Sequence, residues 1–104
     1  IVANSEDRID VNVINTPQKF SLETAYPNPF NPVTNINFAL SEAADVSLKI
    51  YNLQGRVVST LTNANMDAGY YSIIWNADNH SSGIYLLKMV VGDYMKTQKL
   101  MLMK

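Results

Sequence analysis

The residues of this 104-residue chain that could carry out catalysis gather in one stretch, which holds Asp78, His80, Ser81 and Ser82. A carboxylate, an imidazole and a hydroxyl are the parts of a nucleophile with its general base. Members of such a triad normally come from separate elements of a fold, because neighbours in one loop seldom converge in the required geometry. The stretch is also rich in residues that form turns. We therefore interpret His80, the single histidine, as part of a solvated turn, and we expect the chain not to be an enzyme.

Metal binding and glycosylation have only weak signals in the same stretch. Asp78 and Asn79 could offer oxygen ligands to calcium together with loop carbonyls, but their spacing matches no loop with a known order of ligands. Asp67 and Asp93 lie in expected turns, where aspartate commonly accepts backbone hydrogen bonds. Asn79-His80-Ser81 fits the acceptor pattern for N-glycosylation, whose use depends on the host. We expect no metal and no cofactor.

Exposed aromatic rings are another possible binding site, because sugar-binding sandwiches stack such rings on pyranose faces. Tyr51, Tyr70 and Tyr94 could all point outward from the expected strands. Isolated tyrosines on sheet surfaces are also common for cross-strand pairing alone. A carbohydrate-binding or structural accessory module therefore stays as an alternative function.

Composition narrows the remaining classes. The chain is 47% hydrophobic and 16% charged, which is typical of a globular domain, and its net charge of −1 gives no long-range attraction for nucleic acid or anionic lipid. Without cysteine it has no disulfides. Its longest nearly apolar run, Ile84 to Val91, is interrupted by Lys88 and is far shorter than the roughly 20 residues of a membrane span. Since it starts at Ile1 without a signal-like opening, we expect a part of a longer protein.

The elements that must position these residues are strands. Apolar and polar residues alternate with period two in several segments, and no segment of ten or more residues shows a helical period. A two-residue turn at Gly92-Asp93 and a short connection at Gly55 favour hairpins. Thr62 to Ala68 is interpreted as a polar loop. About seven strands predict an all-β, immunoglobulin-like antiparallel β-sandwich with Trp75 in its core. The expected strands are 20–23, 34–40, 46–51, 57–61, 70–75, 84–91 and 94–103.

A segment rich in proline, Tyr26-Pro27-Asn28-Pro29-Phe30-Asn31-Pro32, precedes the first long strand. We call it the proline strap. Proline fixes φ and removes backbone donors, so the strap is expected to be a stiff extended crossing that is clamped at both ends. The side chains of Asn28 and Asn31 are expected to bond the local backbone, and Tyr26 and Phe30 to cover what lies beneath them.

The chain is expected to divide into two parts shortly before the strap. Residues 1–19 are mixed and polar and are interpreted as a linker from a preceding cargo domain, while residues 20–104 form the domain itself. The short alternation from Ile9 to Ile14 could instead be an edge strand, but Pro17 breaks the pattern.

These motifs, in this order, resemble the type A C-terminal sorting domain of the type IX (Por) secretion system. The resemblance covers residues 20–104 and rests on several motifs in series rather than on the strap alone. They are the strap, Thr34-x-Ile36-x-Phe38, Ile50-Tyr51-Asn52-x-x-Gly55, Ala68-Gly69, Trp75, Gly83-x-Tyr85, and Lys99-Leu100-Met101-Leu102-x-Lys104. A related domain, the immunoglobulin-like domain of flagellar hook-capping proteins, shares the tryptophan and the Gly-x-Tyr pattern.

The resemblance implies a β-sandwich that directs a cargo protein of Bacteroidetes and related bacteria across the outer membrane. It implies transit through the periplasm, partners in the outer-membrane translocon and a sortase, cleavage within residues 1–19, and cargo that is attached to the cell surface or secreted. Gly83, Tyr85 and the terminal strand Lys99 to Lys104 are the family positions associated with recognition. We expect that strand to offer an unpaired edge for strand addition by a partner, kept soluble by its lysines.

Overall fold

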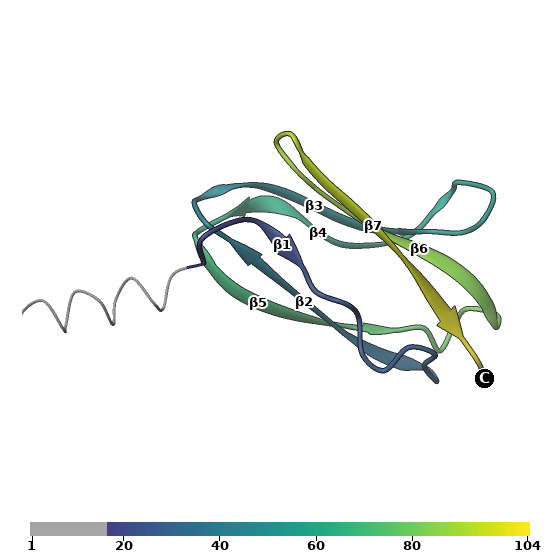
Figure 1. Ribbon diagram of the computed structural model, residues 1–104. Helices are drawn as coiled ribbons and strands as arrows, with labels where there is room; N and C mark the ends of the chain where they lie inside the picture. Colours follow the sequence, from purple (N-terminus) through teal and green to yellow (C-terminus); the bar gives the residue numbers. More distant parts are fainter. Residues whose placement is uncertain (1–16) are drawn as a thin grey trace, which may run out of the picture.

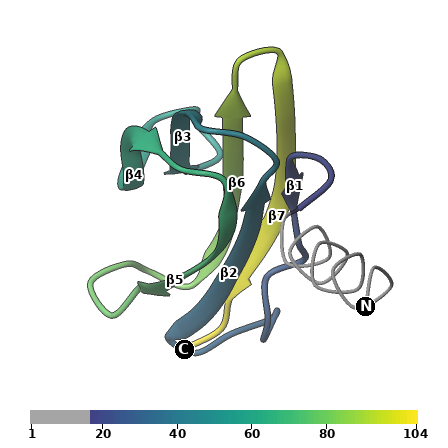
Figure 2. The same ribbon diagram turned by 90° about the vertical axis from the view of Figure 1, so that its left-hand side faces the viewer.

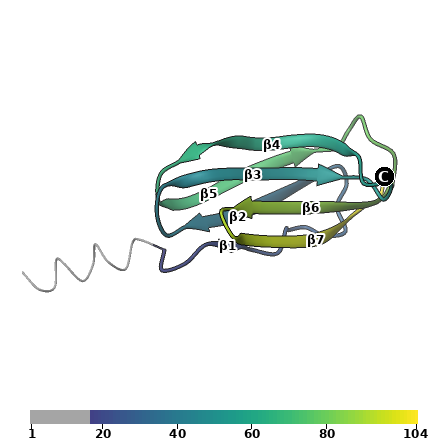
Figure 3. The ribbon, with the colours of Figure 1, turned by 90° about the horizontal axis from the view of Figure 1, so that it is seen from above.

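The computed structural model describes residues 17–104, which form two antiparallel sheets that face each other (Figure 1). The smaller sheet has the strand order β1-β2-β5, and the larger has the order β4-β3-β6-β7, as seen from above in Figure 3. Seven strands in two antiparallel sheets confirm the predicted immunoglobulin-like sandwich. Their bounds are β1 Ser21–Leu22, β2 Val33–Leu40, β3 Ala44–Tyr51, β4 Val57–Met66, β5 Gly69–Asn76, β6 Gly83–Val91 and β7 Tyr94–Leu102.

The core lies between the sheets and is built from the residues that alternation places on the inner faces. Every second residue of a pleated strand points to the same side, so a strand with one buried face shows this pattern. Trp75 is 3% exposed and lies in this core, as predicted. The inner residues of β2, β3 and β6 are also buried, namely Ile36, Phe38, Leu40, Val46, Leu48, Ile50, Tyr85, Leu87 and Met89.

Strand β4 differs from the prediction. The segment Thr62–Ala68 was expected to be a polar loop, but β4 continues to Met66 and only Asp67 and Ala68 remain for the turn. The second half of β4 pairs with β3, as in the pair Val46↔Ala64. Pairing of two strands uses main-chain groups, so polar side chains such as that of Asn63 can face solvent without interrupting it.

The hairpin between β6 and β7 has the predicted geometry. Val91 pairs with Tyr94, which leaves Gly92 and Asp93 as a two-residue turn. Gly92 has a φ of +58° and Asp93 has no positive φ, as a type II′ turn requires. Glycine adopts that positive φ without the steric cost that other residues meet.

The two long sides of the sandwich are formed by different strands, and only one of them carries the proline strap. Figure 2 shows β1 and β7 on one side and β4 and β5 on the other. The proline strap runs along the first side, on its way from β1 to β2. The strap therefore lies where the outer edge of β7, the last strand in its sheet, would otherwise be open.

Three expectations concern the linker, membrane spans and metal binding. The linker over residues 1–19, with its possible strand from Ile9 to Ile14, falls almost wholly outside the described residues. In the part of the chain that the structure describes, no helix is long and apolar enough to cross a membrane. Within the same residues, histidine and acidic side chains form no group of three that could hold a metal ion.

Candidate recognition site at the C-terminal end of the sandwich

The proline strap is held to both sheets through its backbone, in which the prolines can accept hydrogen bonds but cannot donate them. Tyr26 exchanges two backbone hydrogen bonds with Asn35 of β2, with N···O distances of 3.1 and 2.9 Å. At the other end, the carbonyl of Pro32 accepts a hydrogen bond of 2.8 Å from the amide of Ala77. The predicted clamping at both ends agrees with these contacts, because neither end is free to leave the sandwich alone.

Between its two ends the strap also pairs with the last residues of the chain, which lie at the same end of the sandwich (Figure 1). The amide of Phe30 donates to the carbonyl of Met101 at 2.9 Å, and the amide of Met103 donates to the carbonyl of Phe30 at 2.9 Å. These two bonds form a parallel bridge between Phe30 and Leu102. The strap thus serves as a short additional strand beside the end of β7.

Asn28 extends this pairing with its side chain. Its Nδ2 donates to the carbonyl of Lys99 at 2.8 Å, and its Oδ1 accepts from the amide of Met101 at 2.9 Å. The prediction that Asn28 bonds the local backbone is therefore wrong, since its partners lie more than 70 residues away. One planar amide satisfies a donor and an acceptor on β7, as a neighbouring strand would. Asn31 is exposed like Asn28, but within the described residues its side chain makes no hydrogen bond, so the expected bond to the local backbone is absent there too.

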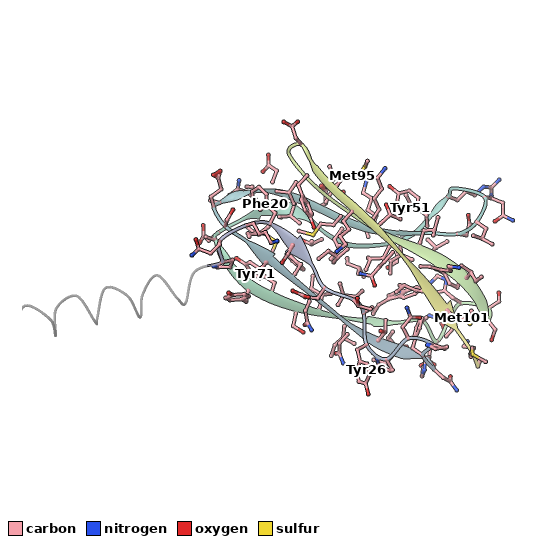
Figure 4. The ribbon with its side chains drawn as sticks, viewed as in Figure 1. Phe20, Tyr26, Tyr51, Tyr71, Met95 and Met101 are labelled. Atoms are coloured by element: carbon pink, nitrogen blue, oxygen red, sulfur yellow. The ribbon has the colours of Figure 1, made fainter. Side chains whose placement is uncertain are left out.

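The ring of Phe30 begins a chain of aromatic contacts that crosses the end of the core. Phe30 is 2% exposed, and its ring centroid lies 5.5 Å from that of Trp75. Trp75 in turn contacts Tyr85 at 5.5 Å, nearly edge-on, and His80 at 5.5 Å. Tyr26 was expected to cover the core as well, but it is 76% exposed and points away from the sandwich (Figure 4).

His80 was predicted to be a solvated turn residue, and this prediction is wrong. Its ring is half-buried and packs against Trp75 and Tyr85. The neighbouring serines have structural partners of their own. The carbonyl of Ser81 accepts a hydrogen bond of 2.6 Å from the Tyr85 hydroxyl, and the Ser82 hydroxyl oxygen accepts one of 2.9 Å from the amide of Lys104. These groups tie the β5–β6 loop to the core and to the end of the chain.

Lys104 is anchored twice on this loop. Besides its amide contact with Ser82, its Nζ donates to the carbonyl of Asp78. The ammonium group of Lys104 thus lies against a backbone oxygen of the loop that leads into Gly83 and Tyr85. Contacts between these segments bring the last residue, the β5–β6 loop and the Gly-x-Tyr motif together.

Gly83 opens strand β6 with a φ of +153°, a conformation that side chains with a Cβ rarely adopt. A Cβ added there would meet no atom within 4 Å, so the backbone conformation rather than lack of space favours glycine. Beside it runs a polar groove between the β3–β4 connection and the β5–β6 loop. The groove is lined by Asn52, Leu53, Gln54, Ser81, Ser82, Gly83, Ile84 and Tyr85.

The terminal strand itself presents alternate residues to the core and to solvent. Leu100 and Leu102 are buried, whereas Lys99, Met101 and Lys104 are exposed. The structure therefore brings the residues predicted to be recognised into one region at an end of the sandwich, which we call the end cluster. It comprises the strap residues Pro27, Asn28, Pro29, Phe30, Asn31 and Pro32, the pair Gly83 and Tyr85, and Lys99, Leu100, Met101, Leu102 and Lys104.

The expectation of an unpaired edge on this strand is wrong for its second half. From Lys99 to Met103 the outer edge is paired by Asn28 and Phe30. Gln98 adds side-chain bonds to the segment before the strap, accepting from the amide of Ala25 at 2.9 Å and donating to the carbonyl of Glu23 at 2.8 Å. Single-sequence patterns carried no signal for these contacts, because their partners lie more than 70 residues apart.

The three tyrosines considered for sugar binding do not share a face. Tyr70 is 67% exposed on the smaller sheet, and Tyr51 lies on the outer face of the larger one. Tyr94 is half-buried, with its ring centroid 6.2 Å from that of Phe20. The prediction that Tyr94 points outward is wrong, and these rings form no common platform for a pyranose.

Replacing Asn28 with alanine should weaken the junction between strap and β7 without disturbing the core. We expect the free energy of unfolding to fall by about 1–3 kcal/mol, because two hydrogen bonds are lost. The loss is not larger, because water can reach the freed groups of β7. Chemical denaturation measures this change. Asn31→Ala is the matched control, since Asn31 lies in the same strap and is also exposed, but its side chain makes no hydrogen bond within the described residues. Equal stability of the two variants would contradict the role of the Asn28 amide.

Comparison with known proteins agrees with this arrangement. Residues 24–103 match the family described as secretion system C-terminal sorting domain. The fold is similar to part of a solved structure, that of dimeric latent PorU from Porphyromonas gingivalis, with a TM-score of 0.59 and 16% identity. That match covers 83% of this chain and 10% of the PorU chain, so the likeness concerns the fold of one domain. No curated protein matches the sequence of this chain.

The match to the family spans more than three quarters of the sequence and includes the strap, the Gly-x-Tyr motif and the terminal strand. These are the segments that the structure joins at one end of the sandwich. The family is one of secretion signals and not of enzymes. The chain therefore belongs to the C-terminal sorting domains of the type IX secretion system.

Proposed function

We propose that residues 20–104 direct a cargo protein, joined at their N-terminal side, through the outer-membrane translocon of the type IX system. A sortase then cleaves within residues 1–19, and the cargo is attached to the cell surface or released. The domain itself carries out no reaction. The observation that supports this proposal is the end cluster, in which the family's motifs meet around the last residue of the chain.

We further propose that the machinery reads the end cluster in its folded form. A receptor that accepts many unrelated cargo proteins can read only an element common to all of them. Strand addition to β7 would be the simplest mode, but Asn28 and Phe30 already pair with the outer edge of its second half. The side chains of Lys99 and Met101, whose backbone is bonded by the strap, and of Lys104, which is anchored on the β5–β6 loop, are exposed and remain available to a partner.

A reporter fusion tests the sorting function. Residues 1–104 are joined to the C-terminus of a fluorescent protein that is directed to the periplasm of a bacterium with type IX machinery. We expect the reporter at the cell surface or in the medium, and in the periplasm when the translocon gene is deleted. Fluorescence after fractionation and accessibility to external protease measure the location. A reporter that remains periplasmic in the intact host would refute the proposal.

Two additions separate the finer claims. Mass spectrometry of the exported reporter should show a new C-terminus within residues 1–19, and an intact C-terminal domain would exclude removal by a sortase. The Asn28→Ala variant distinguishes the two modes of recognition. Export should fall if the folded cluster is read, and it should rise if a partner must first displace the strap from β7.

A further inference from the structure

The outer face of the larger sheet carries an unfavourable pair of charges. Lys49 of β3 and Lys88 of β6 are direct cross-strand partners, so their side chains project from the same face, and both are half-buried. Like charges placed directly opposite each other in an antiparallel pair destabilise a sheet. An uncharged or acidic residue of good strand propensity at one of the two positions would remove this repulsion.

The sheet supplies no carboxylate to offset this pair. Across the four strands of the sheet, Asp45 is the only acidic residue, against four lysines. It lies four positions from Lys49 along β3, roughly 13 Å away. Its Oδ1 accepts a hydrogen bond of 3.1 Å from Asn65 instead. The direct partners of the two lysines on the outer strands are Thr60 and Thr97, which are uncharged.

The face around the lysines is apolar and hollowed. A shallow groove is lined by Tyr51, Gly55, Leu86, Lys88 and Thr97. Next to it, Val90 pairs with Met95, which is 62% exposed. Tyr51 and Met95 both lie on the upper layer in Figure 4, which is the larger sheet. Aliphatic and aromatic side chains thus border two cations that are short of a counter-charge.

We propose that this face docks an acidic, apolar segment of a partner protein. One or two carboxylates of the segment lie between the ammonium groups of Lys49 and Lys88, and its aliphatic side chains contact Tyr51 and Leu86. Charge complementarity supports this choice of partner. A compact phosphate or sulfate group is more often held by arginine forks, and no arginine is among the residues that line the groove, whereas lysines among apolar residues suit carboxylates on a protein. The proposal goes beyond the sorting function and does not depend on it.

A binding experiment with the whole chain tests the proposal. The probe is a labelled ten-residue peptide of alternating glutamate and valine, and the same peptide with serine for glutamate is the neutral control. On addition of the acidic peptide, we expect the largest changes in backbone amide chemical shift at Lys49, Tyr51, Leu86 and Lys88. The double variant K49S/K88S should bind at least tenfold more weakly, whereas K19S/K96S, which removes the same charge elsewhere, should bind as the parent does.

Other outcomes of this experiment would overturn the proposal. Equal binding of the two double variants would show that the lysine pair is not the site. Dextran sulfate and vesicles that contain anionic lipid are tested for binding in the same way. If either binds through Lys49 and Lys88 while the acidic peptide does not, the face is a site for anionic polymers or membranes rather than for a protein segment.

A stability measurement tests the premise independently of any partner. Lys88→Glu places opposite charges across the β3–β6 pair, so the thermal midpoint should rise by about 1–4 °C and the gain should shrink at high salt. Lys96→Glu, which changes the net charge equally but faces Met89, should give no such gain. If Lys88→Glu melts no higher than Lys96→Glu, the two lysines do not repel each other and the proposal fails.

Discussion

Removal of Leu100–Lys104 is expected to abolish both the folding of the domain and the export of its cargo. Leu100 and Leu102 are 0% and 1% exposed and belong to the core. Loss of one such leucine costs about 2–5 kcal/mol, and domains of this size are stable by only about 5–15 kcal/mol. The deletion also removes the residues that pair with Phe30 and the contacts of Lys104 with the β5–β6 loop.

A shorter deletion separates folding from recognition. Removal of Met103 and Lys104 alone takes no buried side chain, because both are exposed. This variant should therefore keep its cooperative thermal transition, followed by circular dichroism, and still export the reporter less efficiently. Normal export of the longer deletion would contradict both the fold-dependent signal and the place assigned to it.

Replacement of Phe30 with alanine is expected to have the next largest effect. The free energy of unfolding should fall by about 3–5 kcal/mol, because a nearly buried ring is lost and a cavity opens against Trp75. The backbone bonds of residue 30 with Met101 and Met103 remain possible, so the change isolates the ring from the strand pairing. Urea denaturation followed by tryptophan fluorescence suits this measurement, since Trp75 is the single tryptophan.

Two other variants serve as controls for the ring. Phe30→Leu keeps most of the apolar volume and should cost clearly less than the alanine variant. Pro29→Ala lies next to it in the strap but changes an exposed residue, so a similar loss from Pro29→Ala would mean that the strap backbone, not the ring, supplies the stability. A loss below 1 kcal/mol for Phe30→Ala would show that the aromatic chain is not a main support of this end.

The sandwich itself could be predicted from the chain because burial of one face imposes period two on each strand. Ile36 and Phe38 in β2, like Leu87 and Met89 in β6, stand at alternate positions of their strands, as that pattern requires, and they are buried. The same method failed for the second half of β4. Its residues after Leu61 show no apolar face, yet the main chain pairs with β3 through Ala64 and Met66. Side-chain patterns report burial and not hydrogen bonding between strands.

The aromatic and asparagine contacts of the strap were assigned less well. Phe30 was expected to cover the core and is buried, but Tyr26, which has the same chemical character, is exposed. Asn28 was expected to bond nearby residues and instead bonds β7. Local propensity describes what a residue can do within a few positions, whereas these outcomes depend on which distant segment lies beside the strap.

The class of fold, the core-facing residues of most strands and the family could all be predicted from the amino-acid sequence. Fold class and core follow from a local physical limit, the pleat of a strand, whereas the family follows from the resemblance of several motifs in series. Tertiary structure alone decided that the strap closes the edge of β7, that His80 packs on Trp75, and that Lys49 faces Lys88. The strap and β7, like the two lysines, belong to segments far apart in the chain, and His80 reaches Trp75 only through the path of the β5–β6 loop, so these contacts exist only once the chain has folded.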